Sequence, residues 1–245
     1  WARVSEVLEV READRGAVQH AVTSWRMVTR DDAHVNLLRG TIATFAAAVG
    51  GAESITTLPF DTAHGLPTEF SRRMARNTQL VAGEEANLGR VTDPAGGAWF
   101  GEALTEQMSG KAWELFQQLE AAGGMTVALA EGLVAAQVAR VAADRAERLA
   151  TRRQPITGVS TFPLAEEPAI DVRNRPPAPQ RAGLAPVRDS EVFEALRDRV
   201  AAAGSPAVFL ACLGSRRDFG GREQFTSNLL LVGGFSSMSC EGGSP

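Results

Sequence analysis

The sequence predicts an α/β protein made of two separate parts. In its first hundred residues, segments rich in β-branched residues alternate with segments in which apolar residues have helical spacing. A proline-rich stretch then interrupts the chain (Pro168, Pro176, Pro177, Pro179 and Pro186), and a further helix and an apolar strand follow it. Strands that alternate with helices indicate parallel βα units, whose ligand sites lie in the loops after the strands.

The first βα unit is expected between residues 17 and 50. Residues 17–29 contain a short stretch that favours a strand. After Asp31-Asp32, which is typical of a helix N-terminus, apolar residues recur at three- and four-residue steps over residues 35–49. This spacing predicts an amphipathic helix, and Gly50-Gly51 is expected to end it.

The second βα unit follows directly. Residues 54–58 favour a strand because β-branched side chains dominate there, and Pro59 ends it. A helix is expected over residues 68–83.

Two further helices are expected before the proline-rich stretch. The turn cluster 93–97 precedes them, and their expected ranges are 104–122 and 127–149. Lys111 falls on the polar side of the first helix and is expected on the surface. Three valines are expected to form the buried stripe of the second helix (Val134, Val138 and Val141).

The part after the proline-rich stretch resembles the beginning of another α/β domain. Ser190 is expected to cap a helix that ends at Gly204, and residues 207–213 form an apolar strand. A helix over residues 223–231 follows, and the tail 235–245 is expected to add nothing to the fold. We therefore divide the chain into a first domain (1–150), a proline-rich linker (151–188) and a truncated second domain (189–245). The prolines between residues 168 and 186 predict an extended segment that cannot build a core.

The composition excludes several classes of protein. With 25 basic and 29 acidic residues, the net charge is −4, so the chain lacks the basic excess of a nucleic-acid-binding surface. It has no apolar run long enough to span a membrane and no signal-peptide pattern at Trp1–Val4, and it is expected to be soluble and cytoplasmic. Cys212 and Cys240 are expected to be reduced thiols.

The motifs of several common sites are also missing. The sequence has no Walker loop, no Gly-x-Gly-x-x-Gly and no His-Glu-x-x-His. Its three histidines, His20, His34 and His64, are too scattered to predict a metal site. We read the loop 214–218 after the apolar strand as a solvated turn, in preference to a phosphate site.

Several longer runs occur in order along residues 17–145. They are Thr23–Trp25, Val35–Arg39, Phe70–Gln79, Glu84–Glu85, Arg90–Gly97 and Ala121–Met125. Together, and above all through Ser-Arg-Arg-Met-Ala-Arg-Asn-Thr-Gln followed by Asp-Pro-Ala-Gly-Gly, these runs resemble the methylmalonyl-CoA mutase family.

The resemblance implies a (βα)8 TIM-type barrel with acyl-CoA along its axis, a wrapping linker and a flavodoxin-like cobalamin domain. In that family adenosylcobalamin starts the radical interconversion of methylmalonyl-CoA and succinyl-CoA. On this template residues 1–90 are the last two βα units of the barrel, and residues 189–245 are a remnant of the cobalamin domain. The chain is then expected to be a C-terminal fragment of the longer protein.

Diagnostic positions are similar to those of the family's small, non-catalytic subunits. Catalytic chains read His-x-Gln-Thr-Ser and Thr-Asn-Ser-x-Asp-Glu where this chain has His20–Ser24 and Thr57–Thr62, so Val22 and Thr62 replace a glutamine and a glutamate. Neither side chain can make the hydrogen bonds of the amide or the carboxylate. The loop 213–219 also lacks the cobalt-ligating histidine of active chains.

The resemblance therefore implies a partner, the large catalytic subunit, which would bind the adenosylcobalamin. We expect no catalytic, cofactor-binding or metal-binding residue in this chain. His20 is the one candidate substrate contact, as a vestige of the substrate-facing side, against the alternative of a hydrogen-bonded structural histidine. Two other functions stay open: a catalytically active acyl-CoA mutase chain, and a scaffold or regulator of another mutase.

Overall fold

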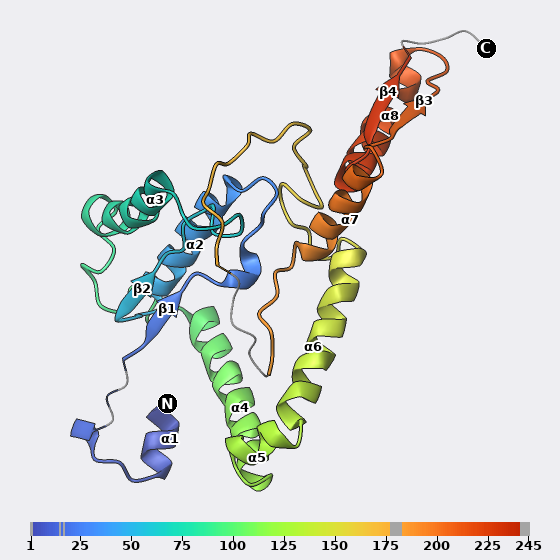
Figure 1. Ribbon diagram of the computed structural model, residues 1–245. Helices are drawn as coiled ribbons and strands as arrows, with labels where there is room; N and C mark the ends of the chain where they lie inside the picture. Colours follow the sequence, from blue (N-terminus) through green and yellow to red (C-terminus); the bar gives the residue numbers. More distant parts are fainter. Residues whose placement is uncertain (1, 15, 17, 177–182, 241–245) are drawn as a thin grey trace.

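The computed structural model describes residues 2–14, 16, 18–176 and 183–240 (Figure 1). Trp1, Ala17, Pro177, Pro179 and residues 241–245 of the tail lie outside this part of the chain. The helices and strands are α1 (Ala2–Val7), β1 (His20–Val22), α2 (Val35–Val49), β2 (Ser54–Thr56), α3 (Glu69–Leu80), α4 (Trp99–Ala121), α5 (Met125–Ala130), α6 (Leu133–Ala150), α7 (Glu191–Ala202), β3 (Ala207–Leu210), α8 (Arg216–Val232) and β4 (Ser236–Ser239).

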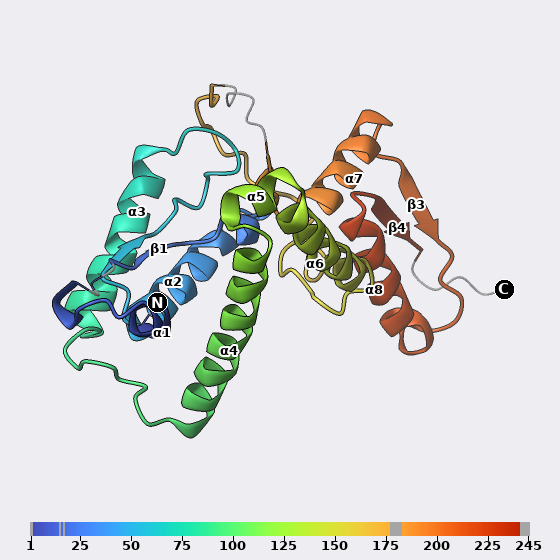
Figure 2. The ribbon, with the colours of Figure 1, turned by 90° about the horizontal axis from the view of Figure 1, so that it is seen from below.

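Strands β1 and β2 pair in parallel and are joined by α2, which confirms the predicted βα arrangement. Helices α2 and α3 both reach Thr57, immediately after β2. Its hydroxyl group lies 2.7 Å from the hydroxyl group of Thr44 on α2 and accepts a hydrogen bond of 3.2 Å from Gln79 on α3. Side chains alternate along a strand, so the face opposite to Thr57 and the two helices carries His20, Val22, Ser54 and Thr56. Figure 2 shows both helices beside this small sheet.

Helix α2 has the predicted bounds, but its buried face is polar and small. Asn36, Gly40 and Thr44 are buried at four-residue spacing. The large apolar side chains of Leu38 and Ile42 are 64% and 69% exposed. The small face allows α2 to approach β2 closely, and it leaves the large apolar side chains of the helix mostly exposed.

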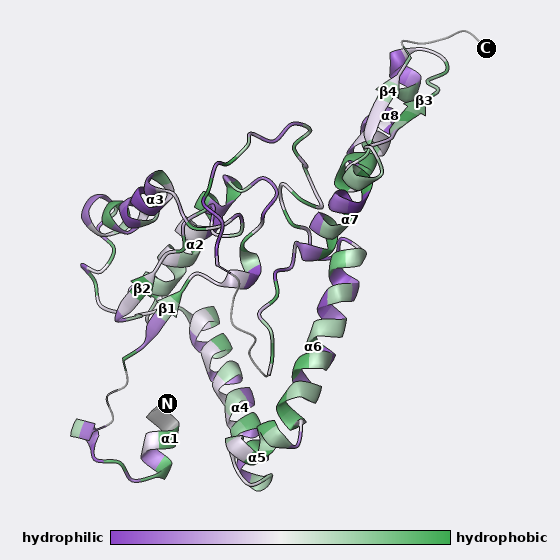
Figure 3. Cartoon of the chain, in the orientation of Figure 1, coloured by the Kyte–Doolittle hydropathy of each residue, from purple (hydrophilic) through white to green (hydrophobic). Residues whose placement is uncertain are grey.

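Helices α4 and α6 diverge from α5 like the two arms of a V (Figure 1). The predicted second helix is divided at Gly132, which has a φ of 78°. Its expected buried stripe is wrong, because Val138 and Val141 are 43% and 48% exposed. Figure 3 shows apolar and polar segments alternating along α6. Periodicity identified the helix but could not show whether another element covers it.

Lys111 on α4 is exposed, as predicted, and pairs with Glu114.

The C-terminal unit, residues 190–239, consists of α7, β3, α8 and β4, with the two strands parallel and Phe209 beside Met238. The expectation that the tail adds nothing is wrong, because residues 236–239 form β4. The strand is mostly serine, so it lacks the apolar pattern on which the prediction relied. Backbone hydrogen bonds to β3 form whatever the side chains are.

The segment between α6 and α7 has no regular helix or strand in its described part, but it is not detached from the fold. Val159 and Ser160 have no exposed surface. These two residues precede the proline-rich residues 168–186, so the part of the linker before that stretch packs into the fold. None of the described helices has both the length and the apolar character needed to cross a membrane.

Candidate functional site

The loops at the carboxyl ends of β1 and β2 are held together by Asn36, at the start of α2. Its side-chain nitrogen donates to the carbonyl groups of Thr29 (2.7 Å) and Phe60 (2.9 Å). Its side-chain oxygen accepts from the Thr29 N–H at 3.0 Å and from Arg39 at 2.8 Å. One buried amide thereby connects the loop after β1, the loop after β2 and α2.

The linker crosses these loops on their outer side. Arg39 donates to the Thr157 carbonyl (2.6 Å), and the Leu66 N–H donates to the Arg173 carbonyl (2.8 Å). Arg175 donates to the carbonyl groups of Thr62 (3.0 Å) and Gly65 (2.9 Å). Residues 157–175 therefore act as a strap over the end of the sheet where parallel βα units place their ligand loops.

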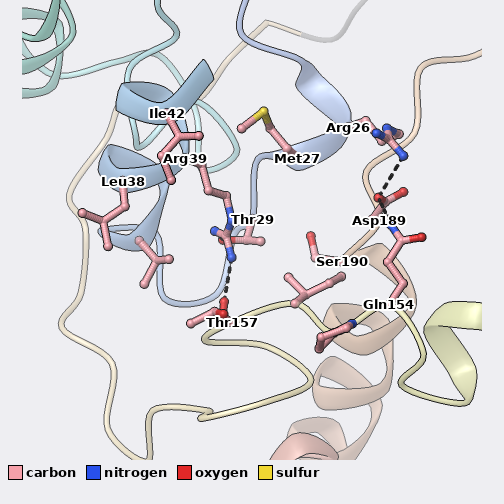
Figure 4. A pocket seen from close by; sticks show the side chains of 13 residues that line it. Arg26, Met27, Thr29, Leu38, Arg39, Ile42, Gln154, Thr157, Asp189 and Ser190 are labelled. Carbon is pink, nitrogen blue, oxygen red and sulfur yellow. Dashed lines mark hydrogen bonds and ion pairs between the residues drawn. The ribbon is translucent and has the colours of Figure 1, made fainter. Parts of the chain in front are cut away.

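A cavity of about 430 Å³ lies between the strap, α2 and the loop after β1 (Figure 4). Its apolar wall includes Met27, Leu38, Ile42 and Ile156. Two polar contacts border it in Figure 4, Arg39 with Thr157 and Arg26 with Asp189, the latter at 3.4 Å. Seven of its thirteen lining residues are polar or charged, and among these Arg39, Asp189 and Ser190 are already engaged in hydrogen bonds or ion pairs within the chain.

Beside the cavity, α7 carries a buried carboxylate, Glu194. It accepts two hydrogen bonds from Arg188, at 2.8 and 2.6 Å, one from Ser190 at 2.6 Å and one from the Arg30 N–H at 2.8 Å. Burial alone raises the pKa of Glu194, but these hydrogen bonds outweigh burial and hold the pKa below its ordinary value. Ser190 is the predicted N-cap residue, yet its hydroxyl group donates to Glu194 instead of capping the helix.

Arg30 completes this cluster from the loop after β1. Its guanidinium group donates to both carboxylate oxygens of Asp198 at 2.8 Å and to Asp31 at 3.0 Å. The hydrogen bond to Asp198 is the main cause of the raised pKa of Arg30, and the same contact lowers the pKa of Asp198. The arrangement is a structural ion-pair cluster that joins segments more than 160 residues apart.

The structure places His20 on the face of β1 that turns away from α2 and α3. Its Nδ1 is hydrogen-bonded to the Ser54 hydroxyl group, and its Nε2 lies 3.1 Å from the Thr56 hydroxyl group. Val22 lies on the same face and is 52% exposed. Thr62 is buried elsewhere, with its hydroxyl group donating to the Pro59 carbonyl at 2.5 Å. The structure does not bring these diagnostic residues together in one site.

The loop after β3 forms the N-terminus of α8. Ser215 and Asp218 make a capping box, in which the Asp218 carboxylate accepts from the Ser215 N–H at 3.0 Å and from its hydroxyl group at 2.6 Å. These hydrogen bonds lower the pKa of Asp218. The carboxylate of this loop therefore caps the N-terminus of α8.

Sequence reasoning missed the buried Asp61. One of its carboxylate oxygens accepts from the Thr68 N–H (3.0 Å) and hydroxyl group (2.9 Å), and the other has no partner in the described part of the chain. A buried aspartate seven residues before a threonine N-cap gives no recognisable local signal. Within the described ranges, no group of three or more His, Cys, Asp or Glu side chains could hold a metal ion.

Comparison with known proteins gives a consistent result. A family model described as methylmalonyl-CoA mutase matches residues 1–205. The methylmalonyl-CoA mutase small subunit of Propionibacterium freudenreichii subsp. shermanii is 54% identical over 245 residues, which are 99% of this chain and 38% of that protein. The small subunit of Streptomyces virginiae is 46% identical over 239 residues, covering 96% of this chain and 38% of its own length.

A more distant similarity extends beyond the small subunits. The mitochondrial methylmalonyl-CoA mutase of Bos taurus is 39% identical over 153 residues, or 62% of this chain and 20% of that protein. This chain spans about 38% of the length of the two small subunits.

Proposed function

This chain belongs to the methylmalonyl-CoA mutase family, and on that premise we propose that it is the C-terminal part of a small, non-catalytic subunit of the mutase. The holoenzyme would use adenosylcobalamin to interconvert methylmalonyl-CoA and succinyl-CoA. The small subunit would pack against the large, catalytic subunit and stabilise it in the cytoplasm. The similarity to small subunits over almost the whole chain supports this proposal.

The observation that carries the non-catalytic assignment is the loop after β3. Its carboxylate, Asp218, is used in the capping box with Ser215, and the loop contains no histidine. Arg216 and Arg217 cannot replace one, because a guanidinium group has no free lone pair for cobalt. All three histidines of the chain precede residue 65, so the residues of the C-terminal unit do not fit a cobalt ligand. We propose that the partner subunit binds the cofactor.

The two βα units would be the last two of a (βα)8 barrel. Parallel pairing of β1 and β2, with α2 and α3 both contacting Thr57, supports this proposal. The opposite face, with His20, Ser54 and Thr56, would then line the barrel interior. There His20 would be a vestige of a substrate contact, now held by two hydroxyl groups.

The C-terminal unit would be the beginning of a degenerate flavodoxin-like domain. Its β3–α8–β4 order, with parallel strands joined by a helix, supports this proposal. We keep the division into residues 1–150, 151–188 and 189–245 as part of it. Hydrogen bonds from Arg39 to Thr157 and from Arg175 to Thr62 attach the middle segment to the first domain at two places.

Co-purification tests the proposed function. The full-length protein that contains this chain is co-expressed with a candidate catalytic subunit, and gel filtration is followed by cobalamin absorbance and mutase rate. We expect a one-to-one complex in which the cobalamin stays with the large subunit after the two are separated. An isolated small subunit that elutes with bound cobalamin, or that turns over methylmalonyl-CoA alone, would favour an active mutase chain instead.

A further inference from the structure

Arg197 on α7 connects three parts of the chain that are far apart in sequence. Its Nη1 donates to Asp31 in the loop after β1 at 2.6 Å, and its Nη2 donates to the Val159 carbonyl group at 2.9 Å. Its Nε donates to the carbonyl group of Val232, the last residue of α8, at 3.1 Å. Each of the three guanidinium nitrogens therefore serves a different segment.

The surroundings of Arg197 are tightly packed. Its side chain is 13% exposed, and Val159 and Val232 are both buried. A Cβ atom on Gly234 would lie 3.2 Å from the Cα of Arg197, so the turn between α8 and β4 packs directly against α7. The three acceptors are thus held at fixed positions around the guanidinium plane.

A second arginine makes the reciprocal contact. Arg30 extends from the loop after β1 to Asp198 on α7, while Arg197 extends from α7 to the same loop. Asp31 lies between them, with one carboxylate oxygen accepting from each arginine. Glu167 of the strap is a further acidic neighbour, with an oxygen 3.7 Å from Nη1 of Arg197.

We propose that Arg197 is a positioning latch that fixes the C-terminal unit, residues 190–239, and the strap to the βα units. The latch depends on the planar, three-nitrogen geometry of arginine more than on its charge. A lysine in this position has one nitrogen on a flexible stem, so it can retain the ion pair with Asp31 but cannot serve three acceptors in three directions. This inference rests on contacts within the chain and is independent of the proposed enzyme partner.

The test compares Arg197→Lys and Arg197→Ala with Arg199→Ala, in the full-length protein that contains this chain. Arg199 lies on the same helix and is exposed, so its variant is a matched control for loss of one arginine. Hydrogen exchange measures protection of residues 157–160 and 230–235, and small-angle scattering measures the radius of gyration. Circular dichroism of each variant reports helix content.

We expect the exchange protection of residues 157–160 and 230–235 to fall by a factor of at least about ten in both Arg197 variants. Their radius of gyration should increase while their helix content is retained. The Arg199 variant should match the unmodified chain. If Arg197→Lys matches the unmodified chain, charge alone suffices and the proposed geometry is wrong. If Arg197→Ala loses helix content, Arg197→Lys decides, since it keeps the charge and the aliphatic stem. Unchanged protection in both variants would refute the latch altogether.

Discussion

The side chain of Asn36 donates a hydrogen bond of 2.9 Å to the main-chain carbonyl group of Phe60, which joins the first turn of α2 to the loop after β2. Asn36 is 4% exposed and also bonds both main-chain groups of Thr29. Its removal would leave several polar groups buried without a partner, and each such group costs about 1–3 kcal/mol.

We therefore expect Asn36→Ala to lower the free energy of unfolding by at least about 2 kcal/mol. Urea denaturation, followed by circular dichroism, measures the change. Asn228→Ala is the control, because Asn228 is exposed on α8 and its loss should have little effect. Equal midpoints for the two variants would show that the Asn36 contacts add nothing to stability.

Local patterns predicted α2 well and its environment poorly. The spacing of apolar residues over 35–49 and the following Gly50 are local features, and the helix has these bounds. Which face is buried depends on β2, and there Gly40 and Thr44 allow closer contact than Leu38 or Ile42 would. Helical periodicity identifies an apolar stripe but does not show what covers it.

The ion-pair cluster could not be predicted for a related reason. In the sequence Asp31 is typical of a helix start, whereas in the structure its carboxylate binds Arg30 and Arg197. The partners lie up to 166 residues apart, and single-sequence reasoning has no means of pairing them. The serine-rich strand β4 was missed because backbone pairing alone forms it.

The buried Glu194 predicts a specific pH dependence. Hydrogen bonds from Arg188, Ser190 and Arg30 outweigh burial and lower its pKa in the folded state. The stabilisation is therefore fully present above the ordinary glutamate pKa of about 4.3 and is lost as the pH falls through the lower folded-state value.

Glu194→Gln should cost about 3 kcal/mol at pH 7, because it removes the closer and more buried of the two carboxylates paired with Arg188 and leaves only Glu191, at 3.4 Å. The difference from the unmodified chain should shrink steadily below about pH 4.3. Denaturation midpoints of Glu194→Gln and of the unmodified chain would be measured between about pH 3 and pH 8, a range that includes the ordinary glutamate pKa. Glu114→Gln, at an exposed pair on α4, should follow the unmodified chain throughout. A constant difference at every pH would contradict the assigned role.

The strap predicts a steric effect at Gly65. A Cβ atom there would lie 2.5 Å from the carbonyl oxygen of Arg173 and 2.9 Å from Val172, so the strap must move away. Gly65→Ala is expected to speed limited proteolysis within residues 168–176, as seen by mass spectrometry of the fragments. Gly83→Ala is the matched control, because a Cβ atom there meets nothing within 4 Å. Identical cleavage rates in the two variants would show that the strap does not depend on this close approach.

The two cysteines should differ in reactivity because their surroundings differ. Cys212, after β3, is 5% exposed, and burial is the main cause of its raised pKa. Cys240, after β4, is only half-buried, and its Sγ lies 3.6 Å from the Cys212 carbonyl oxygen. The thiolate is the reacting species. Cys212 should therefore react slowly for two reasons: the reagent has little access to its sulfur, and the raised pKa keeps the thiol protonated.

Iodoacetamide at neutral pH is therefore expected to modify Cys240 well before Cys212, as measured by peptide mass spectrometry over time. Cys240→Ser should remove the fast phase and leave the slow one, and Cys212→Ser should do the reverse. In denaturant both thiols should react at similar rates, which separates the effect of folding from that of the local sequence. Faster modification of Cys212 in the folded chain would mean that the end of β3 opens to solvent, and that β4 does not protect it.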